Sequence, residues 1–375
     1  MKKRISALIL CFAMALSICA CSGEKNGQGN TQLPAGQTEV NPPTVKTLAA
    51  FDDFATVLKG DYEITDEDVA TYFTAMLCGE GAGLVEVTDR DVVQKGDVVK
   101  VNYSGYHLDA KEPFEGGTAK NQIIDVSGNC AFDEATGSVS NTYIPGFSDG
   151  LVGAKIGEKV NHNVKFPSTY SEKTLAGKET RFEFTVEKIY IKKAPANTTD
   201  EYVAKYLSEQ GFTTVDALVA HSKEELVASG VMNYVISKSE INVPEEYLNS
   251  RLTIYEEAML KTSGQKDLET LAYYYFGSSV ETLRASWLQS IKQQIIAEVV
   301  LAEMVKSKDL EHNQADLDEF VEEILGANSS FASEDEIYMA IGYGNTEAGK
   351  ECLLNEFAIK NYLIEKYRAS QAVTE

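Results

Sequence analysis

The period of hydrophobic side chains changes once along this chain, and the change limits what each part can fold into. Between residues 97 and 193 apolar and polar side chains alternate, as around Phe182 and Phe184. From residue 200 onward apolar side chains recur every three or four residues, as in Leu283 and Trp287. A period of two is typical of half-buried strands and a period near 3.6 of amphipathic helices. We therefore expect an α+β protein, in which a β-sheet adjoins an all-α region.

Local sequence signals predict where two of the helices begin. Thr65 with Asp68 has the pattern of a capping box, in which two side chains satisfy free backbone N–H groups at a helix start. It predicts a helix that ends near Gly79. Ser278 with Glu281 predicts a second capping box, at the start of another amphipathic helix.

Residues 1–20 have the layout of a secretory signal peptide. Lys2, Lys3 and Arg4 precede an apolar run that is too short to span a bilayer comfortably. The end of this run resembles the lipobox of bacterial lipoproteins, with Cys21 as the acylated residue. That resemblance implies a diacylglyceryl group, which anchors a protein stably to a membrane. The alternative is a plain signal peptide with an incidental cysteine.

Residues 21–46 are rich in Gly, Gln, Asn, Thr and Pro and nearly free of large apolar groups. This composition predicts a flexible, solvated tether. Together with lipidated Cys21, the tether predicts a protein that is anchored on the extracytoplasmic face of the cell membrane and stands off its surface.

Charge and cysteine spacing exclude several classes of function. The chain has 34 Lys and Arg against 57 Asp and Glu, a formal net charge of −23. Because nucleic acid binding needs clustered basic residues, we expect no nucleic acid partner. Cys78, Cys130 and Cys352 lie far apart without CxxC spacing, and we interpret His107 and His162 as structural or surface residues. We expect no metal site and no cofactor.

A series of short motifs marks the β-rich region. They are rich in Gly and aromatic residues and lie at 96–106, 114–119, 143–151, 153–158, 166–170, 175–178 and 182–184. In this order they resemble the FKBP-type peptidyl-prolyl isomerase domain, in the version found in trigger factor, over roughly residues 95–191. Each motif alone is weak, but the ordered series is specific. The resemblance implies that residues 95–193 form an FKBP-like domain, an antiparallel β-sheet with a short helix, which isomerises Xaa-Pro bonds.

The chemistry of this reaction explains the residue types. Rotation about a peptide bond is opposed by amide resonance, with a barrier of about 18–20 kcal/mol, and it moves no proton. An apolar aromatic pocket withdraws the solvation that supports the planar ground state and so favours the twisted amide. Such a site requires aromatic side chains and a few orienting polar groups, and no catalytic triad.

The resemblance implies a role for each aromatic residue of the motifs. Phe147 would form the floor of the pocket. The walls would be formed by Tyr103, Phe114, Phe182 and Phe184. Taken alone, the two phenylalanines of the last motif fit ordinary core packing, but the surrounding motifs favour the pocket.

Further residues complete the predicted site. Ile144 would add an apolar contact and hold a substrate carbonyl through its backbone N–H, and Tyr143 would contact substrate. Glu115 would orient Tyr103 or interact with the amide, and Tyr170 would close the pocket and donate a hydrogen bond. The residues expected to act on the reacting amide are Tyr103, Phe114, Glu115, Ile144 and Tyr170.

The interval 129–142 departs from the family, which crosses it in a few residues. We interpret it as a long loop beside Ile144. It would be a lid, a source of specificity, or a segment that occludes the pocket. The predicted fold does not depend on which alternative is right, whereas turnover does.

The flanking regions extend the resemblance to trigger factor. Residues 47–94 resemble its connector, with a helix at 66–79 that would pack on the later helices, and residues 194–375 resemble its helical chaperone part, a trigger factor/SurA-like domain. The ribosome-docking domain has no counterpart, so we expect no ribosome partner. The sequence thus predicts a lipid-anchored foldase that isomerises Xaa-Pro bonds in unfolded or newly exported polypeptides and binds them on its helices. The alternatives are a catalytically weak peptide-binding holdase and a scaffold lipoprotein.

Overall fold

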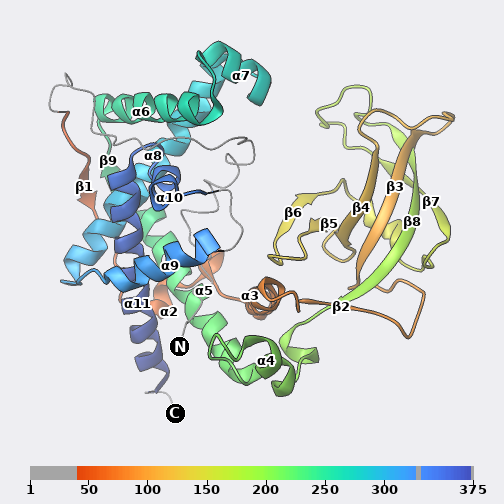
Figure 1. Cartoon of the computed structure of the whole chain (residues 1–375), viewed down its shortest axis with the longest axis horizontal. Helices are drawn as coiled ribbons and strands as arrows, with labels where there is room; N and C mark the ends of the chain where they lie inside the picture. Colours follow the sequence, from red (N-terminus) through yellow and green to blue (C-terminus); the bar gives the residue numbers. More distant parts are fainter. Residues whose placement is uncertain (1–39, 327–330, 373–375) are drawn as a thin grey trace. The chain divides into compact units, whose positions relative to one another are not determined.

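The computed structural model describes residues 40–326 and 331–372, without the side chains of residues 140 and 141. The predicted signal peptide, Cys21 and the tether up to residue 39 lie outside the described residues. The chain forms two compact units. The first is Thr65–Ser222, and the second consists of the described residues before and after it. The first unit combines the β-rich region with the helices on either side of it, and the second is mainly helical (Figure 1).

The first unit contains a seven-stranded antiparallel sheet. Its strands are β2 (Leu84–Glu86), β3 (Val98–His107), β4 (Thr118–Asp125), β5 (Cys130–Phe132), β6 (Val139–Thr142), β7 (Lys159–Lys165) and β8 (Glu179–Lys192). The order is β2-β8-β3-β4-β5-β6, and β7 also pairs with β8. The short helix of the region is the 3-10 turn η2 (Ser148–Leu151). The predicted α+β fold with an antiparallel sheet is confirmed.

The pairing of β3 with β8 creates the aromatic face of the sheet. Tyr103 lies opposite Phe184, and Gly105 lies opposite Phe182. Directly opposed residues of neighbouring strands project from the same face, so these four positions lie together. This face covers the main hydrophobic core of the unit.

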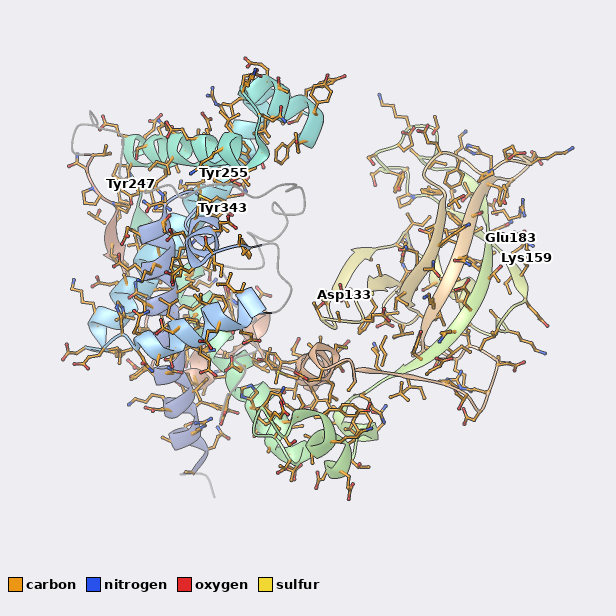
Figure 2. All side chains as sticks on the ribbon, viewed as in Figure 1. Asp133, Lys159, Glu183, Tyr247, Tyr255 and Tyr343 are labelled. Carbon is orange, nitrogen blue, oxygen red and sulfur yellow. The ribbon has the colours of Figure 1, made fainter. Side chains whose placement is uncertain are left out.

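The opposite face of β8 is polar. Glu183 forms an ion pair with Lys159 of β7 at 2.7 Å, and Figure 2 shows the two side chains next to each other. Arg181, on the same face, lies over the ring of Tyr106 at 4.5 Å from the ring centroid. Exposed ion pairs contribute little to stability, so the sheet is stabilised mainly by packing on its apolar face.

The interval 129–142 forms a hairpin, so the prediction of a loop is wrong. Its strands, β5 and β6, pair with each other, and β5 also pairs with β4. At the turn, labelled by Asp133 in Figure 2, the Asp133 carboxylate accepts hydrogen bonds from the N–H groups of Ala135 at 2.8 Å and Thr136 at 2.9 Å. The strands have three and four residues, which leaves too little alternation for the sequence pattern to reveal.

This hairpin packs on α3 (Asp66–Gly79). Phe132 is buried in a small cluster with Cys78 of that helix. Gly137 lies so close to α3 that a Cβ on it would meet the Cα of Ala75 at 2.7 Å. The inserted segment is therefore anchored on the helix, and Phe132 packs there rather than with the aromatic face.

Residues after α3 contact α4 (Asp200–Leu207) and the turn between α4 and α5 (Val215–Lys238), which come after the 3-10 turn η3 (Pro195–Asn197). The hydroxyl of Tyr202 donates to the carbonyl of Ala82 at 2.9 Å. The amide of Gln210 donates to the carboxylate of Glu80 at 2.8 Å. These contacts tie the two flanks of the sheet into one unit.

One predicted helix start is confirmed and another is wrong by one residue. The Thr65 hydroxyl accepts from the N–H of Asp68 at 3.2 Å, and the Asp68 carboxylate accepts from the N–H of Thr65 at 2.8 Å. Helix α8 (Val280–Ser307), in contrast, has Ser279 as its N-cap, not Ser278. Both serines have the same capping tendency, so the sequence does not distinguish them.

The second unit consists of helices and a two-stranded sheet. Its further elements are β1 (Thr44–Thr47), α2 (Phe54–Val57), η1 (Gly60–Tyr62), β9 (Glu240–Asn242), α6 (Glu245–Ser263), α7 (Leu268–Phe276), α9 (Gln314–Gly326), α10 (Glu334–Ile341) and α11 (Thr346–Ala372). Because β1 pairs with β9, the last residues of the predicted tether form a strand. None of the helices in the described ranges combines the length and the apolar character that crossing a membrane requires.

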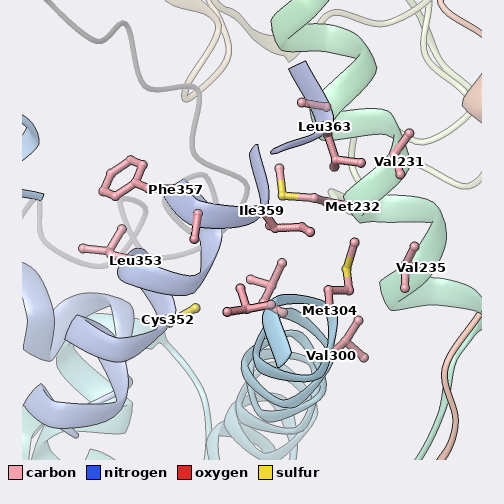
Figure 3. Close-up of a cluster of buried hydrophobic side chains, with 14 of the residues drawn as sticks. Val231, Met232, Val235, Val300, Met304, Cys352, Leu353, Phe357, Ile359 and Leu363 are labelled. Atoms are coloured by element: carbon pink, nitrogen blue, oxygen red, sulfur yellow. The ribbon is translucent and has the colours of Figure 1, made fainter. Parts of the chain in front are cut away.

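The main core of the second unit lies between α5, α8 and α11 (Figure 3). Val231 and Met232 of α5, Met304 of α8 and Ile359 of α11 are all at most 2% exposed. Phe51, from the segment before α2, belongs to the same core. Residues near 51, which the sequence assigns to the connector, therefore pack with the helices that follow the sheet.

Two ion pairs join α6 to α8 and differ mainly in burial. Arg251 is 2% exposed and donates to both carboxylate oxygens of Glu298 at 2.8 and 2.9 Å and to the carbonyl of Gly342 at 2.9 Å. Arg284 donates to both oxygens of Glu256 at 2.6 and 2.9 Å, but its side chain is 48% exposed. Next to these pairs, the rings of Tyr255 and Tyr343 lie 5.1 Å apart (Figure 2).

Replacing Arg251 with Ala should lower the free energy of unfolding of the second unit by about 3–5 kcal/mol, because Glu298 would lose its partner in the interior. The matched variant Arg284→Ala should change it by at most about 1 kcal/mol. Urea unfolding followed by the fluorescence of Trp287, the single tryptophan of the chain, measures both. An equal loss of unfolding free energy in the two variants would contradict the claim that burial makes the Arg251–Glu298 pair more important for stability.

Candidate active site on the β3–β8 face

Three buried phenylalanine rings form the base of an aromatic cluster. Phe182 and Phe184 come from β8 and are 4% and 0% exposed, and Phe147, from the residue before η2, is 2% exposed. The ring centroid of Phe147 lies 4.9 Å from that of Phe182 and 5.1 Å from that of Phe184, edge to face in both cases. Such contacts are favourable and leave little room for water.

Two half-buried tyrosines flank this base. Tyr103 of β3 lies with its ring centroid between 5.2 and 6.1 Å from all three phenylalanines. Tyr143 stacks on Phe147 at 4.5 Å, and its ring lies 6.4 Å from that of Tyr103, edge to face. Burial raises the pKa of both phenols. Both hydroxyls therefore stay protonated at neutral pH and are able to donate hydrogen bonds.

Phe114 reaches the cluster because two glycines leave space for its ring. A Cβ at Gly105 would lie 2.5 Å from the Phe114 ring, and one at Gly117 would lie 2.6 Å from it. The N–H of Phe114 donates to the Gly105 carbonyl at 3.0 Å, which folds the β3–β4 connection back. The ring then lies 5.8 Å from Phe182. A glycine inside a strand usually weakens it, and the close approach of the Phe114 ring explains why β3 has a glycine at position 105.

Tyr170 lies at the solvent side of the cluster. It is 38% exposed, and its ring is 4.6 Å from that of Phe166, which is 5% exposed. Phe166 lies in turn 6.1 Å from Phe114. Phe166 is missing from the predicted site, although the motif that contains it was recognised. Its position just after β7 and before Pro167 was the sequence signal that could have placed Phe166 in the site.

Ile144 and Glu115 lie at the edge of the cluster. Ile144 is half-buried and packs on the rings. Among the hydrogen bonds of the described residues, none has the backbone N–H of Ile144 as its donor. Glu115 is exposed in the turn after Phe114. No described contact joins Glu115 to Tyr103, and the roles predicted for Glu115 in orienting Tyr103 or acting on the amide stay predictions.

Sequence patterns did not reveal Asn129, which binds the segment that contains Tyr143 and Ile144. Its side-chain amide donates to the carbonyls of Tyr143 at 3.0 Å and Ile144 at 3.1 Å. Its side-chain oxygen accepts from the N–H of Ser148 at 2.9 Å. These partners are backbone groups at least 14 residues away, which have no residue signature.

The structure brings the predicted aromatic side chains into one cluster. They are Tyr103, Phe114, Tyr143, Phe147, Tyr170, Phe182 and Phe184. Within the described part of the chain, no group of three His, Cys, Asp or Glu side chains is placed to hold a metal ion. His162 lies 3.0 Å from the carbonyl of Gly146 through Nε2. The cluster is able to bind an apolar ring away from water while N–H and O–H donors hold the adjoining peptide.

Comparison with known families identifies both regions. Residues 90–189 match the family model of FKBP-type peptidyl-prolyl cis-trans isomerases, and residues 214–361 match that of the bacterial trigger factor C-terminus. Residues 90–189 are thus similar to FKBP-type isomerases, and residues 214–361 are similar to the C-terminal part of bacterial trigger factor. The whole aromatic cluster falls within the FKBP-type match.

Trigger factors of several bacteria are similar over most of this chain. The trigger factor of Macrococcus caseolyticus is 28% identical over 77% of this chain and 65% of its own length. That of Alkaliphilus metalliredigens is 31% identical over 71% of this chain and 60% of its own length. The chain thus spans less than two thirds of these relatives. A solved structure described as the trigger factor chaperone covers 89% of this chain and 81% of its own at 17% identity, with a TM-score of 0.30.

Proposed function

We propose that this chain catalyses cis-trans isomerisation of Xaa-Pro bonds in unfolded polypeptides at the aromatic cluster of the β3–β8 face. The observation that carries the proposal is the gradient of burial across the cluster. Phe147, Phe182 and Phe184 form a dry base, while Tyr103 and Tyr170 remain accessible at its edge. We propose that a proline ring packs at this accessible edge, with its amide at the boundary between rings and donors.

In this mechanism the residues act by binding and desolvation. The proline ring would pack at the accessible edge of the aromatic cluster, and the N–H of Ile144 would hold a substrate carbonyl. The planar amide is more polar than the twisted one, so removing water raises the planar form relative to the transition state. Each lowering of the barrier by about 1.4 kcal/mol increases the rate tenfold.

Truncating Tyr103 to Ala should lower kcat/KM for a proline peptide by about tenfold or more, because the edge of the dry base would open to water. Tyr106→Ala is a matched control, since Tyr106 lies on the same strand but packs with Arg181 on the opposite face. It should leave kcat/KM within about twofold. The rate of peptide isomerisation, followed by NMR exchange spectroscopy, measures both. Equal effects would place the activity elsewhere.

A second activity, binding of unfolded segments, is supported by the end of α7. Tyr273 and Tyr274 are 71% and 76% exposed, and the neighbouring Tyr275 and Phe276 are 43% and 38% exposed. Contiguous exposed aromatic side chains are typical of interaction surfaces. They lie within the region that matches the trigger factor C-terminus. We propose that this aromatic surface of α7 binds unfolded clients, and that it acts as a holdase where the isomerase site does not turn over.

Replacing Tyr273 and Tyr274 together by Ser should remove at least about half of the suppression of aggregation, because apolar contact area with the client is lost. Light scattering of a refolding client measures the effect. Leu325→Ser, at a 38% exposed position on α9, is the control and should change little. Peptide isomerisation should stay unchanged in both variants. Full suppression by the double variant would contradict the role of α7.

We further propose that the chain works on newly exported polypeptides at the outer face of the cell membrane, held by lipid on Cys21. The support is the basic start, the apolar run and the lipobox-like end of residues 1–21. The strongly acidic composition gives no electrostatic attraction to anionic lipid, so the acyl chains would provide the attachment. We propose neither the ribosome nor nucleic acid as a partner.

Expressed in a bacterial host, the full chain should fractionate with membranes and incorporate labelled fatty acid. Cys21→Ser should lose the label and leave the membrane fraction, because the acylated sulfur is absent. Cys19→Ser is the matched control, two residues earlier in the same segment, and should keep both properties. Label retained in Cys21→Ser would contradict the assignment.

A further inference from the structure

We infer that Asn129 is a positioning residue for the isomerase site, which fixes residues 143–148 and so directs the N–H of Ile144 toward a bound peptide. The inference rests on the proposed function. It gives the inserted hairpin a role in building the site, in addition to its contact with α3.

Asn129 holds this segment by four hydrogen bonds. Its backbone carbonyl accepts from the N–H of Tyr143 at 2.9 Å. Its side-chain amide donates to the carbonyls of Tyr143 and Ile144, and its side-chain oxygen accepts from the N–H of Ser148. Three of the four bonds come from the side chain, so no residue without an amide provides the same set.

The bond to the Tyr143 carbonyl sets the direction of the Ile144 N–H. These two groups belong to one peptide unit, which is planar and trans, so they point in opposite directions. Because Asn129 holds the carbonyl, the N–H is directed away from Asn129. This N–H is also the group that finds no acceptor among the described residues.

The hairpin is what brings Asn129 to this place. Cys130 pairs with Thr142 at the base of β5 and β6, and the bond between Asn129 and Tyr143 continues that ladder by one step. The two ends of the hairpin thus lie next to each other. Asn129 therefore lies directly opposite Tyr143, where its side chain reaches residues 143–148.

The backbone of Asn129 adopts a φ of 49°, in the left-handed region that Asn and Gly tolerate better than other residues. Asn129→Gly therefore keeps the backbone conformation and removes only the amide. Asn121 offers a matched control, because it has a φ of 54° and is exposed on β4. Asn121→Gly removes the same side chain from a comparable conformation.

The test is titration of the full chain with a proline-containing peptide, with the amide signal of Ile144 followed by NMR and isomerisation measured on the same samples. We expect Asn129→Gly to raise the Kd by about tenfold, and kcat/KM to fall through KM with kcat within about twofold. Asn129→Asp should also weaken binding, because a carboxylate accepts from Ser148 but does not donate to the two carbonyls. Asn121→Gly should bind like the wild type.

The outcomes separate this inference from the proposed function. A raised Kd in a chain that shows no turnover supports the positioning role and ends the catalytic proposal. An unchanged Kd in Asn129→Gly overturns the positioning role even when the wild type is active. Lower thermal stability with unchanged Kd shows a purely structural residue and overturns it as well, as does a wild type that binds no peptide.

Discussion

The register between β3 and β8 is the constraint on which the site depends. It sets Tyr103 opposite Phe184 and Gly105 opposite Phe182. A shift of one residue would turn one strand's side chains to the polar face, where Arg181 and Glu183 lie. Because Gly105 has no side chain, the ring of Phe114 fits next to it. The ring of Phe147 packs edge to face on Phe182 and Phe184. The pairing of β3 with β8 thus brings together aromatic residues that are about 80 positions apart in the sequence.

The hairpin at 129–142 lies between the aromatic cluster and helix α3. Phe132 and Gly137 pack on α3, which fixes the outer part of the hairpin. At its base Asn129 binds the Tyr143–Ile144 peptide. The hairpin therefore connects the aromatic cluster with the helix that precedes the sheet, within one compact unit.

Much of this was predictable from the sequence, and the reasons differ between elements. Strong alternation in β3 and β8 predicted a sheet and the shared face of Phe182 and Phe184. The ordered motifs predicted which aromatic side chains gather there. The hairpin was missed because its strands are short and its turn is polar, and Asn129 because its partners are backbone groups. Ser278 and Ser279 are chemically equal as caps, so only the folded helix distinguishes them.

The central claim is that a dry cluster of rings accelerates rotation of an Xaa-Pro bond without any proton transfer. The most direct test is the cis-trans exchange rate of a proline peptide with a catalytic amount of the wild-type chain, measured across a range of pH. Unaided exchange takes tens to hundreds of seconds. The account predicts exchange that is far faster and nearly independent of pH between 6 and 8, since both phenols stay protonated there. Exchange at the unaided rate, with the peptide bound at the cluster, would contradict it.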